Sequence, residues 1–169
     1  NARNAMVALL AVNIYGIKLT DGINSLKKFK GVAKRQDLLM DEERLLLIED
    51  FAHHPTAIET TLKGIKKAYS NRKIYAAIEL RSNTMKSGFH DDRLINVCSL
   101  VDKVFWKSED KDQAKKLVEA LPDKSSQIIN IENFIDEFKQ INKKGDVLVV
   151  MSNGNFDNLS QLLMNEFKK

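Results

Sequence analysis

Three clusters of polar residues follow three apolar runs that have the character of β-strands. They occupy residues 50–55, 81–85 and 152–155. In an open α/β sheet, ligands bind beyond the carboxyl ends of the strands, so loops that follow neighbouring strands meet along one edge. The three clusters therefore predict one binding site assembled from distant parts of the chain.

The first cluster contains Asp50 and His53, which could contact a nucleotide. An acidic side chain at a strand end can accept hydrogen bonds from ribose hydroxyls, although a turn or helix-capping aspartate explains Asp50 equally well. His53 is followed by His54, but zinc needs three or four ligands at ordered spacing. We therefore predict no metal site, and His53 is either a polar contact or a packed residue that orients Asp50.

The second and third clusters are suited to anions. Arg81, Ser82 and Asn83 together offer a guanidinium fork, a hydroxyl and an amide, which can hold a carboxylate by paired hydrogen bonds. We favour this role over an arginine that pairs with a neighbouring acid. Ser152 and Asn153 come before a predicted helix, where backbone N–H groups can bind an anion, or where they can form an ordinary turn and cap.

The chain lacks both common phosphate-binding loops. Neither G-x-x-x-x-G-K-[ST] nor G-x-G-x-x-G occurs in it, and these are the loops that cradle phosphates in P-loop and dinucleotide-binding folds. If the protein uses ATP, the phosphate cradle lies outside these residues.

The apolar spacing predicts the elements that position the clusters. A helix over residues 4–14 ends before Gly16, and a second helix, capped by Thr20 or Asp21, ends before Gly31. Two β-like runs, 37–40 and 44–49, form a hairpin. From Pro55 onward helices alternate with strands, which predicts a Rossmann-like, mostly parallel α/β sheet of about six strands with helices on both faces. The expected further strands are 74–79, 104–106, 127–131 and 147–151.

Composition narrows the classes of function. A chain of 169 residues can form one domain with a real core, and its net charge is only +4. Its lysines are dispersed among acidic residues, which argues against a nucleic-acid groove. The apolar runs are too short to span a bilayer. The single cysteine, Cys98, is typical of a reducing compartment, so we expect a cytoplasmic protein without nucleic-acid or membrane partners.

Several segments in order resemble the Mur ligase family. They are residues 1–4, 31–37, 49–58 and 151–154. On this resemblance, residues 1–30 are the end of the central domain with its linker, and residues 31–169 are the C-terminal domain. Residues 79–85 resemble the E-P-R-S-N-T-M block of members that add a tripeptide, with Leu80 in place of the proline. Asn155 stands where the family has a glycine.

The resemblance implies ATP-dependent amide-bond formation with Mg²⁺. The carboxylate of UDP-N-acetylmuramate becomes an acyl phosphate, and the amine of L-alanyl-γ-D-glutamyl-meso-diaminopimelate attacks it. The implied ATP contacts are Asn1, Asn4, Arg35 at the phosphate end, Asp50 at the ribose, and His53. The implied tripeptide contacts are Arg81, Ser82, Asn83, Ser152 and Asn153. Catalytic residues, the phosphate loop and most magnesium ligands would lie in the missing N-terminal and central domains, so the fragment alone is expected to be inactive.

Two alternatives stay open on the sequence. One is a Mur ligase that adds L-alanine rather than a tripeptide. The other is a non-catalytic nucleotide- or peptide-binding module with an α/β fold.

Overall fold

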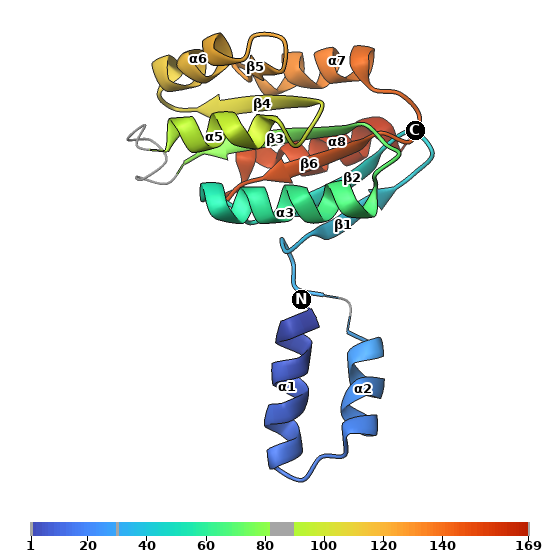
Figure 1. Cartoon of the computed structure of the whole chain (residues 1–169). Coiled ribbons are helices and arrows are strands. Elements are labelled where there is room, and N and C mark those ends of the chain that lie inside the picture. The colour runs from blue at the N-terminus through green and yellow to red at the C-terminus, as the bar shows by residue number, and fades with distance from the viewer. Residues whose placement is uncertain (1, 30, 82–89, 169) are drawn as a thin grey trace. The chain divides into compact units, whose positions relative to one another are not determined.

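The structure is a computed structural model that describes residues 2–29, 31–81 and 90–168 (Figure 1). The chain divides into two compact units, Asn1–Val32 and Ala33–Lys169. Each unit is described by itself.

The first unit is a pair of helices, α1 (Ala2–Ile14) and α2 (Leu19–Lys27), with no buried residue in either. The helices approach closely at Gly22, where a Cβ atom would lie 2.6 Å from the Cδ2 atom of Leu9. The predicted cap at Thr20 or Asp21 is wrong, because α2 begins after Lys18, which makes no side-chain cap. Among the described residues, no helix is long and apolar enough to cross a membrane.

The second unit is built on one mixed sheet of six strands in the order β1-β2-β6-β3-β4-β5. Only the β1–β2 pair is antiparallel, and every other neighbouring pair is parallel. The strands are β1 (Asp37–Asp41), β2 (Leu46–Asp50), β3 (Ile74–Leu80), β4 (Lys103–Ser108), β5 (Ser125–Gln127) and β6 (Val147–Met151). The predicted mostly parallel α/β fold is confirmed.

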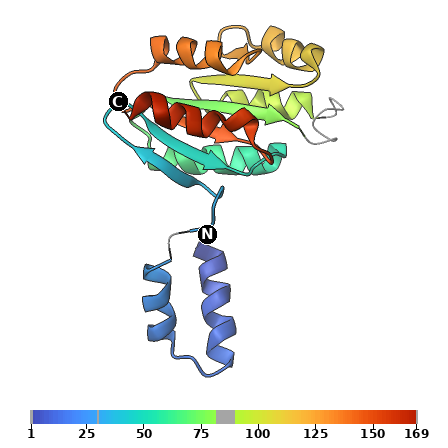
Figure 2. The ribbon, with the colours of Figure 1, turned by 180° about the vertical axis from the view of Figure 1, so that it is seen from behind.

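Helices cover both faces of this sheet, because side chains alternate between the faces along each buried strand. One apolar cluster joins the sheet to α3 (Pro55–Ala68), α5 (Asp91–Cys98) and α6 (Lys111–Ala120). The other joins it to α7 (Ile131–Ile141) and α8 (Leu159–Phe167). Helices α3 and α5 lie on the face seen in Figure 1, and α8 lies on the face seen in Figure 2. β3, buried at all seven positions, is covered on both faces.

Two local predictions differ from the structure. The expected strand 127–131 is wrong, because β5 ends at Gln127 and α7 begins at Ile131. Asn130 caps α7 by accepting a hydrogen bond from the Asn133 backbone N–H at 3.0 Å, so the apolar residues after β5 enter a helix. The second difference is α5, a helix of eight residues, which the apolar spacing did not predict.

The aromatic core beneath α7 gives the first testable expectation. Phe138 has no exposed surface and lies with its ring centroid 5.4 Å from that of Tyr75 and 5.9 Å from that of Phe167. Phe138→Ala should lower the free energy of unfolding of the second unit by about 3–5 kcal/mol, because it leaves a cavity. Urea unfolding followed by the fluorescence of Trp106, the single tryptophan, measures this loss. Phe29→Ala, at a position 62% exposed in the first unit, is the matched control and should leave the Trp106 transition unchanged.

Candidate functional site at the carboxyl edge of the sheet

The ends of β2, β6 and β3 lie side by side at one edge of the sheet, since β6 pairs in parallel with both neighbours. The Ser152 backbone N–H donates to the Asp50 carbonyl oxygen at 3.1 Å, which joins the loop after β6 to the end of β2. Parallel pairing therefore brings the first and third polar clusters together, and it brings Arg81 of the second cluster to the same edge. Ser82 and Asn83 lie outside the described residues.

Polar side chains from neighbouring strands form a row on the α7–α8 face. Leu148 and Tyr75 belong to the core on that face, so strand alternation directs Ser152 and Glu79 to it as well. The Ser152 hydroxyl donates to Glu79 Oε2 at 2.5 Å and accepts from the Gly154 backbone N–H at 2.8 Å. Lys107 on β4 is in register with Glu79. These polar side chains take the place of apolar packing at the carboxyl ends of the strands, where the sheet extends beyond its apolar core.

Arg81 lies directly against Gly154. A Cβ atom built on Gly154 would stand 2.4 Å from Arg81 Nη1 and 2.9 Å from Cζ. That spacing is far below any normal contact, so only glycine allows the guanidinium to lie there. Arg81 and the third cluster thus form one surface, in which the exposed Arg81 side chain covers the loop after β6.

Lys34, Glu49 and Glu79 also lie in the site, although the sequence did not predict them there. Lys34 Nζ donates to the Gly154 carbonyl oxygen at 2.7 Å and lies 4.0 Å from Glu49 Oε1. Glu49 also accepts from the Ser160 hydroxyl at 3.0 Å. Both glutamates could have been found from the sequence, because each places a charge at a core-facing position near the end of a strand. Lys34 left no comparable signal, because its partner is 120 residues away.

Asp50 is a buried junction between loops. Its Oδ1 atom accepts from the Ala52 backbone N–H at 2.7 Å and from the Thr61 hydroxyl at 3.4 Å, and its Oδ2 atom accepts from the Gln36 backbone N–H at 2.9 Å. The side chain is 5% exposed. These contacts fit the structural interpretation of Asp50, and its contact with a ribose stays a prediction.

Arg35 and His53, two of the other residues expected at the nucleotide, lie beside Phe51, which is exposed. The Arg35 guanidinium lies 5.8 Å from the Phe51 ring centroid, and the His53 ring meets the Phe51 ring edge-on at 5.0 Å. His53 Nδ1 is 3.0 Å from the Phe51 carbonyl oxygen. A guanidinium beside an exposed aromatic ring suits a nucleotide, because the guanidinium can bind the phosphate and the ring can stack on the base. Asn4 is exposed on α1 in the other unit, and Asn1 lies outside the described residues.

Asn153 has a buried acceptor for which the described residues provide no donor. Its Oδ1 atom is buried and receives no hydrogen bond in the described part of the chain. A buried carbonyl oxygen without a donor costs free energy. An N–H group from a bound molecule would remove that cost, which suits Asn153 to a substrate amide or amine.

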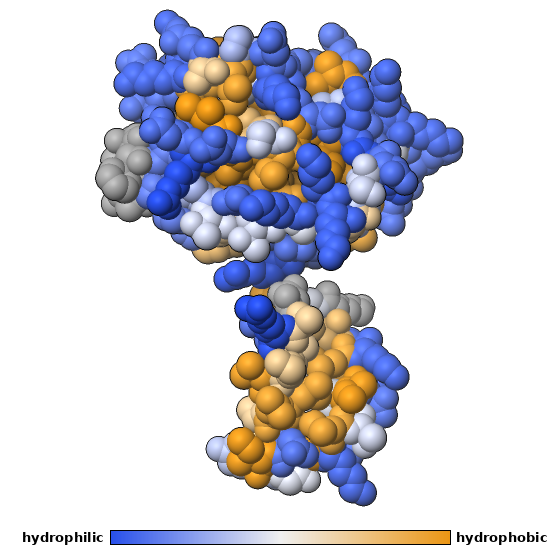
Figure 3. Space-filling model, in the orientation of Figure 1, coloured by the Kyte–Doolittle hydropathy of each residue, from blue (hydrophilic) through white to orange (hydrophobic). Residues whose placement is uncertain are grey.

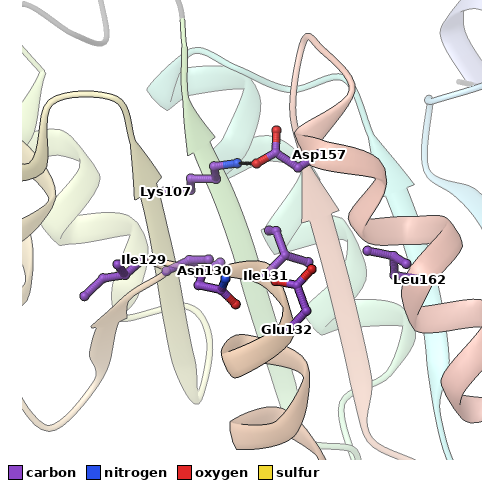
Figure 4. Close-up of a pocket in the computed structure, with 8 residues that line it drawn as sticks. Lys107, Ile129, Asn130, Ile131, Glu132, Asp157 and Leu162 are labelled. Atoms are coloured by element: carbon purple, nitrogen blue, oxygen red, sulfur yellow. Dashed lines mark hydrogen bonds and ion pairs between the residues drawn. The ribbon is translucent and has the colours of Figure 1, made fainter.

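A cavity of about 240 Å³ adjoins this edge between the end of β4, the start of α7 and the turn before α8 (Figure 4). The Lys107 ammonium pairs with the Asp157 carboxylate at its rim and lies 5.6 Å from the Phe156 ring centroid. Phe156, Asp157 and Asn158 all have positive φ, at 44°, 48° and 59°. Left-handed backbone is strained for residues other than glycine, so this ion pair and the buried Phe156 ring hold a strained turn beside the Ser152–Gly154 loop.

Nucleophilic and metal chemistry have little support in the described residues. The Cys98 thiol donates to the Leu94 carbonyl oxygen at 3.6 Å, and burial raises the pKa of Cys98 to about 12, so the thiol is protonated at neutral pH. His54 stacks edge-on with His90 at 4.8 Å. Within residues 2–29, 31–81 and 90–168, no three His, Cys, Asp or Glu side chains gather to hold a metal ion.

The chain is similar to ligases whose names refer to UDP-N-acetylmuramate or to murein peptide. The family model "Mur ligase, glutamate ligase domain" matches residues 34–154. UDP-N-acetylmuramate–L-alanyl-γ-D-glutamyl-meso-2,6-diaminoheptandioate ligase of Escherichia coli is 31% identical over 100% of this chain, and UDP-N-acetylmuramate–L-alanine ligase of Brachyspira hyodysenteriae is 30% identical over 95% of it. The chain spans 38% and 37% of their lengths. The crystal structure of a murein peptide ligase from Psychrobacter arcticus is 35% identical, with a TM-score of 0.71 over 97% of this chain and 36% of that one.

The Asp50 junction gives a second expectation. Asp50→Ala leaves the backbone N–H groups of Gln36 and Ala52 without their acceptor, so the free energy of unfolding should fall by about 1.5–3 kcal/mol. Asp123→Ala, at an exposed position on the same unit, is the control and should change it by less than about 0.5 kcal/mol. Urea unfolding of both variants measures the difference. Equal stabilities would contradict the structural role of Asp50.

Proposed function

The chain belongs to the Mur ligase family, and we propose that it is the C-terminal part of an ATP-dependent ligase that joins L-alanyl-γ-D-glutamyl-meso-diaminopimelate to UDP-N-acetylmuramate. The observation that most supports this proposal is the Arg81 guanidinium against Gly154, at the edge where ligands bind in such sheets. A guanidinium there suits the carboxylates of an acidic peptide. Residues 79–85 also resemble the corresponding block of the tripeptide-adding members.

The proposed reaction has two steps. ATP phosphorylates the carboxylate of UDP-N-acetylmuramate, and the peptide amine then attacks the acyl phosphate and displaces phosphate. In this chain, Arg81 would bind a peptide carboxylate, and Asn153 Oδ1 would accept a hydrogen bond from a peptide N–H. Ser152, Ser82 and Asn83 stay predicted tripeptide contacts. We propose that this serves the reuse of cell-wall peptides, in the cytoplasm, where ATP and the nucleotide sugar are available.

The nucleotide half of the site is proposed around Phe51. Arg35 would meet the phosphate end of ATP, and the Phe51 and His53 rings would flank the nucleoside. Asp50, Asn4 and Asn1 stay predicted contacts. Mg²⁺ neutralises phosphate charge in phosphoryl transfer, but the described residues of this chain do not gather three metal ligands. On the family resemblance, we propose that the metal and the catalytic residues belong to other domains of the polypeptide.

We further propose that the first unit packs against a preceding domain of the same polypeptide. The chain spans only 38% of the E. coli relative, and both helices of the unit lack buried residues. Figure 3 shows apolar side chains over much of the visible side of this unit. An exposed apolar surface of this kind marks an interface. Its large exposed side chains are Met6, Val7, Leu10, Ile14, Tyr15, Ile17, Leu19, Ile23, Phe29 and Val32.

A truncation tests that interface. Residues 33–169 should unfold at the same urea concentration as the 169-residue chain when Trp106 fluorescence is followed, because the second unit has its own core. Removal of residues 1–32 should also abolish most binding of a hydrophobic dye such as 1-anilinonaphthalene-8-sulfonate. Dye binding that persists in the shorter chain would place the uncovered apolar surface elsewhere.

Activity of the whole enzyme tests the ligase proposal. The full-length protein should release phosphate from ATP with UDP-N-acetylmuramate and the tripeptide, and not with L-alanine. Arg81→Ala should raise the tripeptide KM at least tenfold, because a charged hydrogen bond to the substrate is worth about 1.5–3 kcal/mol. The ATP KM should change less than twofold, and Arg93→Ala, at an exposed position on α5, should change neither value.

The alternatives predict other outcomes. Turnover with L-alanine rather than the tripeptide would identify an L-alanine-adding ligase. The 169-residue chain alone should hydrolyse no ATP, and appreciable hydrolysis would contradict its proposed status as a fragment. A gene that encodes only this domain, without an upstream phosphate-binding loop, would favour a non-catalytic module.

A further inference from the structure

We propose that Lys34 is a positioning residue that braces the nucleotide half of the site against the peptide half. This inference rests on the proposed function, because it assigns Arg35 to one half and Arg81 to the other. Lys34 precedes Arg35 in the chain, and its side chain reaches the Gly154 carbonyl oxygen. One residue thereby joins the loop before β1 to the loop after β6.

The backbone of Lys34 is fixed in an unfavourable conformation. Its φ is 57°, a left-handed value that glycine adopts without strain and other residues adopt at a cost. Its carbonyl oxygen accepts from the Phe51 backbone N–H at 2.7 Å. A glycine would relieve the strain and keep this backbone hydrogen bond. The contacts of the lysine side chain are therefore what offsets the strain at this position.

The Lys34 side chain makes directed contacts. Its Nζ atom donates to the Gly154 carbonyl oxygen at 2.7 Å, and Glu49 Oε1 stands 4.0 Å away. The side chain is 38% exposed, so the ammonium stays in contact with water and needs no fully buried partner. Glu49 is held in turn by the Ser160 hydroxyl. The ammonium therefore has one defined direction, toward the loop after β6.

The Gly154 peptide is held from three sides. Lys34 binds its carbonyl oxygen, Ser152 Oγ accepts from its N–H, and Arg81 covers its Cα. The Arg81 side chain cannot move closer to Gly154. Loss of the Lys34 contact would release the turn after β6, against which the Arg81 side chain lies. The spacing between Arg35 and Arg81 thus depends on Lys34.

This spacing matters for the proposed chemistry. An amine attacks an acyl phosphate efficiently only when the two groups are held near their reacting distance, and small misplacements cost large factors in rate. A brace between the two half-sites should affect turnover more than the binding of either substrate. An effect on turnover without an effect on binding distinguishes Lys34 from Arg81, which is expected to bind the peptide itself.

Amide hydrogen exchange in the 169-residue chain tests the brace directly. Lys34→Met should speed exchange of the Gly154 N–H at least tenfold, because the turn loses its anchor, while Phe51 N–H exchange stays within about threefold. Lys34→Arg keeps a cation of similar reach and should restore slow exchange at Gly154. Lys63→Met removes a lysine from a surface pair with Glu59 on α3 and is the matched control, expected to change neither amide.

Turnover of the full-length enzyme supplies the second measurement. Lys34→Met should lower kcat about tenfold, with the KM values for ATP and tripeptide within about threefold of wild type, the mark of a positioning role. Unchanged Gly154 exchange in Lys34→Met overturns the brace. Failure of Lys34→Arg to restore slow Gly154 exchange also overturns it. If Lys34→Met speeds Gly154 exchange but the full-length wild-type protein shows no ligase activity, the brace is supported and the proposed function is contradicted instead.

Discussion

The parallel alignment of β2, β6 and β3 is the constraint on which the rest of the site depends. Parallel strands end at the same edge, and β6 pairs with both neighbours. The Ser152 N–H continues this pairing one step beyond the strands, to the Asp50 carbonyl oxygen. With β6 in this position, Gly154 lies within reach of Arg81 from one side and Lys34 from the other. An antiparallel β6 would carry the loop to the opposite edge.

Along one face of β3 the side chains change from apolar to charged toward the end of the strand. Tyr75 and Ala77 pack in the α7–α8 core, and Glu79, two residues later, faces the same side. Burial of a carboxylate is costly unless hydrogen bonds compensate it, and the Ser152 hydroxyl is the donor that meets Glu79. That bond also orients Ser152 to accept from Gly154 N–H. One contact thus stabilises a buried charge and shapes the loop.

The class of fold, and the placement of Asp50, Arg81 and Ser152 at or just after the ends of strands, could be predicted because both follow from local patterns. Apolar runs with helical or strand spacing show which segments pack, and polar residues directly after strands mark the binding edge. Short elements were less predictable. β5 has three residues and no apolar side chain, whereas Ile128, Ile129 and Ile131 have the composition of a strand. The start of α7 depended on a single cap, Asn130.

The contacts within the site could not be predicted in the same way. The pair of Lys34 and Gly154 is separated by 120 residues, and neither residue type indicates the other. Gly154 was recognisable as part of a turn, but its close contact with the Arg81 side chain could not be predicted, because Arg81 follows a different strand. Asp50 was located correctly at a strand end, yet its carboxylate faces backbone N–H groups of its own unit. Tertiary contacts decide such roles.

Two acids at this edge are buried and two arginines are exposed, and this arrangement favours anionic ligands. Asp50 and Glu79 are buried and accept hydrogen bonds from the protein, whereas Arg35 and Arg81 are exposed. The buried carboxylates accept hydrogen bonds from the loops, and the exposed guanidinium groups remain available to ligands. A bound phosphate or carboxylate would therefore meet positive charge first, although the net charge of the whole chain is only +4. Local placement, rather than total charge, gives this edge its preference.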